Sequence, residues 1–209
     1  MKNIFLLLLL LSSIFCSAQT LTIQVAENHF KIDETHSLIV SHIENIESYT
    51  DVSGYSTIVL SLNNIDYTFN SIPSSINYTQ PFPVSKSPKQ YTLYFTELPL
   101  VSVETQNTIV DEPKVHANFM YSDSVQIVIS DIGIELRGGV SQDYPKKTYD
   151  LEFWEDASGE ETENVQFGDL RSDDDWILDA LYNEPLRLRS YIANKLWLQM
   201  HTPHYISQE

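Results

Sequence analysis

Short runs of alternating or β-branched residues, separated by turn-forming clusters, dominate the first half of the chain. Four such runs stand out, at residues 21–25, 37–40, 56–60 and 91–95. Asn, Ser, Gly and Pro gather between them, as at 51–54 and 81–83, and these residues favour turns through their backbone preferences. This pattern predicts a sheet, and we expect a β-sandwich-like module over residues 19–97.

The first 18 residues are typical of a signal peptide. Lys2 precedes an apolar run from Ile4 to Leu11, and small residues follow up to Ala18. The run is too short to cross a bilayer core of about 30 Å, and the small residues suit cleavage after Ala18. A lipid anchor on Cys16 is the alternative, although the bulky residue before it fits such a site poorly. We expect a secreted protein, periplasmic or extracellular, with no membrane attachment after the leader is removed.

Charge and cysteine content exclude several classes of function. The chain has 12 Lys and Arg against 29 Asp and Glu, a formal net charge of -17. A nucleic-acid partner is excluded, because binding a phosphate backbone requires a dense basic surface. The single cysteine, Cys16, lies in the leader. The mature chain therefore has no disulfide, no zinc–thiolate site and no cysteine nucleophile.

A second segment, residues 98–209, begins where Pro99 interrupts the preceding strand pattern. Strand-like runs continue through it, at residues 98–103, 125–129, 134–137, 147–154 and 176–180. One helix is predicted after them, with Asn183 or Glu184 as its cap and Pro185 in its first turn. Its apolar stripe, Leu188, Ile192 and Leu196 with Ala193, Trp197 and Met200, predicts packing on the sheet, and Pro203 ends the helix.

Several motifs of the second segment resemble the CotH (spore coat protein H) kinase family. They are residues 98–105 and 111–115, the glycine-bearing stretch 133–138, Ser141-Gln142, 145–147 with Tyr149, and 174–178 with Tyr182 and Arg189. They follow the order of the family over about residues 98–205, which makes a chance match improbable.

The resemblance implies an atypical protein kinase that uses ATP and Mg²⁺ to phosphorylate serine or threonine on an extracytoplasmic protein. The expected fold class is α+β. A β-sandwich-like N-terminal module is followed by an incomplete kinase-like N-lobe, which is mostly antiparallel sheet plus one helix.

Two glycines and two lysines are the first candidates for nucleotide binding. Gly138 and Gly139 lack Cβ, so the backbone there can approach a phosphate closely, although a plain hairpin turn would also explain them. Lys147 shares the strand parity of the apolar residues that follow it, whereas Lys146 shares the parity of solvent-facing acids. Lys147 is therefore the first choice for the phosphate contact, with Lys146 as an ordinary solvated charge.

Arg189 and the run 173–175 are candidates of a different kind. Arg189 lies at the edge of the helical stripe, where its guanidinium could bind a phosphate or form a surface ion pair. Three consecutive aspartates suggest calcium, but consecutive residues entering a strand cannot all face one ion. We interpret Asp173 and Asp174 as a solvated turn, and Trp176 as a core residue or a neighbour of a purine ring.

The second half of the family's kinase domain, which brings its catalytic and metal-binding aspartates, has no counterpart before Glu209. We therefore expect no catalytic residue and no metal ligand within these residues, and an N-terminal portion that is inactive by itself. The alternative is a non-catalytic secreted binding or structural protein with a degenerate kinase-like domain.

Overall fold

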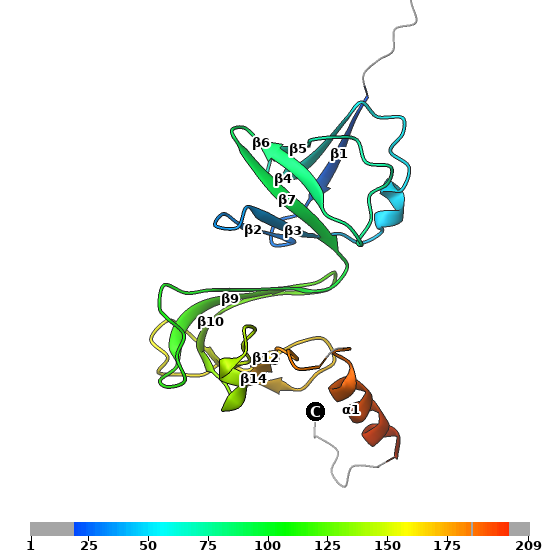
Figure 1. Cartoon of the computed structure of the whole chain (residues 1–209). Coiled ribbons are helices and arrows are strands. Elements are labelled where there is room, and N and C mark those ends of the chain that lie inside the picture. Colours follow the sequence, from blue (N-terminus) through cyan, green and yellow to red (C-terminus); the bar gives the residue numbers. More distant parts are fainter. Residues whose placement is uncertain (1–18, 185, 201–209) are drawn as a thin grey trace, which may run out of the picture. The chain divides into compact units, whose positions relative to one another are not determined.

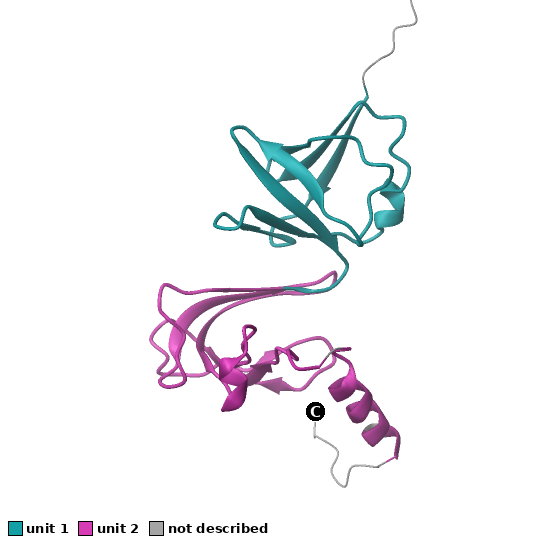
Figure 2. Cartoon of the chain, viewed as in Figure 1, with its two compact units in different colours: residues 1–100 teal, residues 101–209 magenta. Residues whose placement is uncertain are grey.

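A computed structural model of the chain describes residues 19–184 and 186–200. The chain divides into two compact units, residues 1–100 and 101–209, which Figure 2 shows in two colours. Each unit has its own sheet (Figure 1). Each also has its own hydrophobic core. Independent folding of residues 19–97 stays a prediction.

The first unit is one mixed sheet of seven strands that curls around its core. The strands are β1 (Thr20–Val25), β2 (Phe30–Asp33), β3 (Leu38–His42), β4 (Thr57–Leu62), β5 (Ile65–Phe69), β6 (Phe82–Lys86) and β7 (Lys89–Thr96), in the spatial order β1-β4-β5-β6-β7-β3-β2. The pairs β1–β4 and β3–β7 are parallel, and the others are antiparallel. A short 3₁₀ helix, Ile46–Tyr49, lies between β3 and β4.

Alternation explains why these segments are strands. In β7 the side chains of Tyr91, Leu93 and Phe95 are buried, and those of Thr92 and Tyr94 between them are exposed. Strand side chains point to opposite faces in turn, so this spacing places one face on the core.

The second unit is built on a five-stranded sheet in the order β14-β11-β10-β9-β8. Its strands are β8 (Leu100–Glu104), β9 (Val115–Ser122), β10 (Ile127–Leu136), β11 (Tyr149–Trp154) and β14 (Asp175–Leu178), while β12 (Val165–Gln166) and β13 (Ser172–Asp173) form a separate ladder. The pairs β9–β10, β10–β11 and β11–β14 are antiparallel. The runs expected at 125–129 and 134–137 fall on one ten-residue strand, β10.

Aromatic side chains fill the core of this unit. Phe153 is fully buried on β11, and its ring meets that of Phe119 edge to face, with 5.0 Å between the ring centres. Phe167 packs against both rings and against Trp176. The α+β class, mostly sheet with one α-helix among the described residues, is confirmed.

The helix differs from the sequence prediction. It is α1, Arg189–Met200, and it begins later than the predicted first turn; Pro185 and Pro203 lie outside the described residues. Its predicted packing on the sheet is wrong, because the stripe residues Leu188, Ile192, Leu196, Trp197 and Met200 are 47–83% exposed. The apolar side chains are spread too widely around the axis to form one buried face. Neither Asn183 nor Glu184 is at the cap position, although the buried Glu184 carboxylate, five residues before α1, accepts a hydrogen bond from the backbone N–H of Arg189.

The described helices include none that is long and apolar enough to span a bilayer.

Candidate functional site

The glycine turn follows the end of β10. Gly138 has a φ of +94°, and a Cβ on it would lie 2.2 Å from the Ser141 hydroxyl oxygen, so the backbone requires glycine there. A Cβ on Gly139 would meet nothing within 4 Å. The chain then forms a short 3₁₀ helix, η2 (Val140–Asp143). Gly138 therefore shapes the turn, and the backbone at Gly139 borders open space.

Gln142 connects this turn to Lys147. Its side-chain amide donates to the carbonyl oxygen of Gly138 and to Oδ1 of Asp111, the latter over 2.6 Å. Its own backbone carbonyl accepts a hydrogen bond from the Lys147 ammonium. Lys147 is half-buried and Lys146 is exposed, the difference that strand alternation predicts. The structure thus brings Gly138, Gly139 and Lys147 together.

Arg189 does not join this group. It is exposed at the first position of α1, and no hydrogen bond or ion pair joins its side chain to the turn or to Lys147 in the part of the chain that is described. Of the five predicted nucleotide-binding residues, Lys146 and Arg189 remain peripheral to the contact between the turn and Lys147.

An acidic cluster around Lys114 escaped the sequence reasoning. The Lys114 ammonium lies 3.4 Å from Asp150, 3.8 Å from Glu135 and 3.9 Å from Glu152. Burial opposes the charged form, but the surrounding carboxylates raise the pKa of Lys114 above its ordinary value. Glu135 is directly opposite Asp150 in the sheet. Alternation places Asp150 and Glu152 on the face of β11 opposite Leu151, but the position of Lys114 depends on strand register, which local patterns do not reveal.

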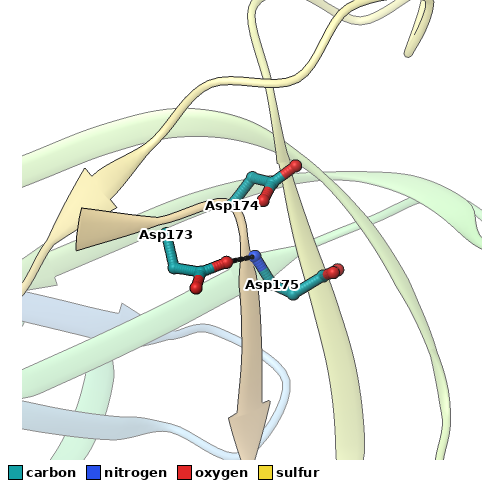
Figure 3. A group of neighbouring side chains, drawn as sticks. All are labelled: Asp173, Asp174 and Asp175. Carbon is teal, nitrogen blue, oxygen red and sulfur yellow. Dashed lines mark hydrogen bonds between the residues drawn. The ribbon is translucent and has the colours of Figure 1, made fainter. Parts of the chain in front are cut away.

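The three aspartates are closer together than the sequence predicted. Asp173, Asp174 and Asp175 each place one carboxylate oxygen within 4.8 Å of the others (Figure 3). The expectation that they cannot approach one ion is wrong, because the chain bends between the end of β13 and the start of β14 instead of continuing as one strand. The Asp175 backbone N–H donates to Asp173 over 3.1 Å, the contact dashed in Figure 3.

The pKa values of Asp174 and Asp175 are shifted in opposite directions. A hydrogen bond from the side chain of Thr162 lowers the pKa of Asp174. Burial raises the pKa of Asp175, and the negative charge of Asp174 raises it further. These acids could hold a cation, although exposed acidic groups are common without one.

An apolar pocket of about 170 Å³ lies on the face of the sheet that carries Leu151. It is lined by Val101, Phe119, Tyr121, Leu151, Phe167, Leu170, Trp176, Ile177 and Leu178. Trp176 packs edge to face on Phe167, with 4.9 Å between ring centres, and its indole N–H donates to the Asp173 carbonyl over 2.9 Å. Trp176 is therefore both a packing residue and a wall of the pocket.

The family comparison covers the glycine turn, Lys147 and the three aspartates but not Lys114. The family model described as CotH kinase protein matches residues 134–206. The matched region includes the end of β10, the glycine turn, β11, β14 and α1. The resemblance to the CotH kinase family is therefore confirmed for this region. No curated protein and no solved structure matches the chain.

Proposed function

We propose that the second unit is the nucleotide-binding part of a CotH-like protein kinase, in which Lys147 and the Gly138–Gly139 turn hold the phosphates of ATP. One observation carries the proposal: Gln142 bonds to the glycine turn through its side chain and to the Lys147 ammonium through its backbone. Phosphoryl transfer depends mainly on positioning and on charge neutralisation, and a loop plus a lysine supply the first contacts.

The electrostatic environment of Lys147 supports its role. Its ammonium bonds to a neutral carbonyl, and no carboxylate of the described residues lies within ion-pair distance of it. Exchanging that carbonyl for a phosphate oxygen would create a stronger, charge-assisted hydrogen bond. Lys114 is the opposite case, because three carboxylates already surround it. A phosphate there would meet repulsion, so Lys147 is the better phosphate ligand.

The apolar pocket is the proposed site of the purine base. Leu151, which lines it, shares the face of β11 predicted for Lys147, and Tyr149 between them pairs with the pocket residue Leu178. Ligand sites typically combine apolar walls with a few polar groups, as this arrangement does.

Mg²⁺ would neutralise phosphate charge when bound. The three aspartates do not fit that task beside Lys147, because Asp175 pairs with Glu152, on the face of β11 opposite Leu151. Export and the phosphorylation of serine or threonine on an extracytoplasmic protein remain part of the proposal, which rests on the leader and on the family resemblance.

A non-catalytic binding or structural protein is the second candidate. The observation that favours it is the same contact: a lysine satisfied by a carbonyl within its own turn can simply stabilise that turn.

Measuring ATP binding to the full chain distinguishes the kinase proposal from the non-catalytic one. Calorimetry would compare the wild type with Lys147→Ala and Lys146→Ala. Loss of one charge-assisted hydrogen bond should weaken binding about tenfold or more in Lys147→Ala. Lys146→Ala is the matched control, one residue away and exposed, and should bind like the wild type.

Adenosine, which lacks phosphates, should bind the wild type and Lys147→Ala equally. Unfolding midpoints of all three proteins check that the fold is retained. Absence of ATP binding in the wild type, or equal losses from both lysines, would refute the assignment.

A further inference from the structure

Two histidines of the first unit lie side by side on neighbouring strands. The pairing of Phe30 with Ser41 in β2–β3 places His29 beside His42 at the next position. The backbone N–H of His42 donates to the carbonyl of His29 over 2.7 Å, and their ring centres are 5.7 Å apart. The sheet therefore holds both imidazoles at neighbouring positions.

The ring of His42 has one satisfied and one unsatisfied nitrogen. Nδ1 lies 3.1 Å from the carbonyl oxygen of Leu98. A carbonyl only accepts hydrogen bonds, so Nδ1 carries the proton of the neutral ring and Nε2 carries the lone pair. His42 is 6% exposed, and its Nε2 is buried without a hydrogen-bond partner. Such an atom is uncommon in a folded protein and requires an explanation.

β3 lies between β7 and β2 in the sheet, and Leu98 follows β7 in the chain. The ring of His42 therefore contacts the β7 side through Nδ1. The ring of His29, which directly precedes β2, lies on its other side, with 5.7 Å between the ring centres.

We propose that His29 and His42 form a binding site for a borderline transition-metal ion such as Zn²⁺. Neutral imidazole nitrogens are ligands that Zn²⁺, Ni²⁺ and Cu²⁺ accept. Two imidazoles bound tetrahedrally to one ion have ring centres roughly 5 Å apart, close to the 5.7 Å observed. The contact of Nδ1 with the Leu98 carbonyl is the outer hydrogen bond that usually fixes a metal-binding histidine.

The ion would give the buried Nε2 of His42 the partner it lacks. Within residues 19–184 and 186–200, no group of three or more His, Cys, Asp or Glu side chains includes this pair, so the pair supplies two ligands. The site lies outside the region matched by the kinase family and is independent of the proposed nucleotide binding.

Calorimetric titration of the metal-free full chain with ZnCl₂ tests the proposal, with His29→Gln as the variant. Removing one of two protein ligands should weaken the binding at least about tenfold. His36→Gln is the matched control, because His36 belongs to the same unit but is exposed and lies 2.6 Å from Asp33. It should bind like the wild type. Undiminished binding in His29→Gln would assign the ion to another site, such as the three aspartates, and overturn the proposal.

Imidazole ¹⁵N NMR of the wild type gives a second readout that needs no variant. Zn²⁺ should shift the Nε2 resonance of His42 and leave its Nδ1 protonated. Saturation with Zn²⁺ should also raise the melting temperature of the wild type and of His36→Gln. An unchanged Nε2 resonance at saturating Zn²⁺ would refute the site even if His29→Gln failed to fold.

Discussion

Replacing Lys114 with methionine should destabilise the second unit through charge repulsion. Methionine keeps much of the apolar stem and removes the ammonium. The carboxylates of Glu135, Asp150 and Glu152 lie 3.4–3.9 Å from that ammonium. They would then face one another with only the more exposed Arg137, 2.6 Å from Asp150, as a neighbouring cation. Asp175 would add to this, since its pKa is already raised and Lys114 acts to lower it.

The size of the effect follows from partial exposure. Removing one partner of a fully buried ion pair costs about 3–5 kcal/mol, whereas an exposed pair contributes roughly 0–1 kcal/mol. The side chain of Lys114 is 22% exposed, and those of its three partners are 19–31% exposed. The site lies between the two limits, so we expect a loss of about 2 kcal/mol in the free energy of unfolding at pH 7.

The loss should shrink in acid. A carboxyl whose pKa is higher in the folded than in the unfolded state gains protons first in the folded state, so folding is favoured as pH falls through the folded pKa. The folded pKa of Asp175 is raised, and removing Lys114 raises it further. The deficit of the variant should therefore be largest near neutral pH and decrease toward pH 4.

Urea unfolding followed by tryptophan fluorescence measures this effect. All three tryptophans, Trp154, Trp176 and Trp197, belong to the second unit, so the signal reports that unit alone. Urea is preferable to guanidinium chloride because salt would screen the charges. The control is Lys146→Met, which removes an exposed lysine and should leave the midpoint unchanged. Equal losses at pH 7 and pH 4, or an equal loss in Lys146→Met, would contradict the electrostatic explanation.

Two further predictions concern the same unit. Gly133→Ala should lower the free energy of unfolding by about 1–3 kcal/mol, because its Cβ would lie 2.2 Å from the Trp154 ring. Gly139→Ala should have no such effect, since a Cβ there meets nothing within 4 Å. Urea unfolding of both variants would measure the difference. Burial, with a hydrogen bond to Asp123, raises the pKa of Tyr121 to about 12. Tyr121→Phe should therefore remove a late step from the alkaline absorbance titration, and the wild type should lose stability relative to the variant as pH rises from 10 toward 12; an unchanged titration would refute this.

Alternation led to the prediction of some strands, but a strand with the same pattern was missed. β7 was predicted because aromatic and aliphatic residues alternate in it with polar ones. β5 was not predicted, although the two adjacent asparagines before it, Asn63 and Asn64, are typical of a hairpin turn. Their φ values of 47° and 61° form a two-residue turn that pairs Leu62 with Ile65, and adjacent asparagines favour such turns.

Only those features of the candidate site that depend on residues adjacent in the chain could be predicted from the sequence. The contrast between Lys146 and Lys147 follows from period-two alternation, which is contained in neighbouring residues. The cluster around Lys114 depends on pairing between β10 and β11 and on a residue that precedes β9, so no local pattern encodes it. The packing of α1 was predicted wrongly because its apolar residues, although numerous, do not gather on one side and are exposed.

The parallel pairs of the first unit have a consequence for how quickly it folds. β1 pairs with β4, joining Thr20 to Thr57, and β3 pairs with β7, joining Leu38 to Thr92. Long loops must close before these contacts form, whereas β9 pairs with β10 and β10 pairs with β11, in each case the next strand along the chain. We expect the second unit to fold faster than the first. During synthesis β1 emerges early but stays unpaired until β4 has been made. The edge of β1 is therefore open to incorrect pairing for longer than any strand of the second sheet.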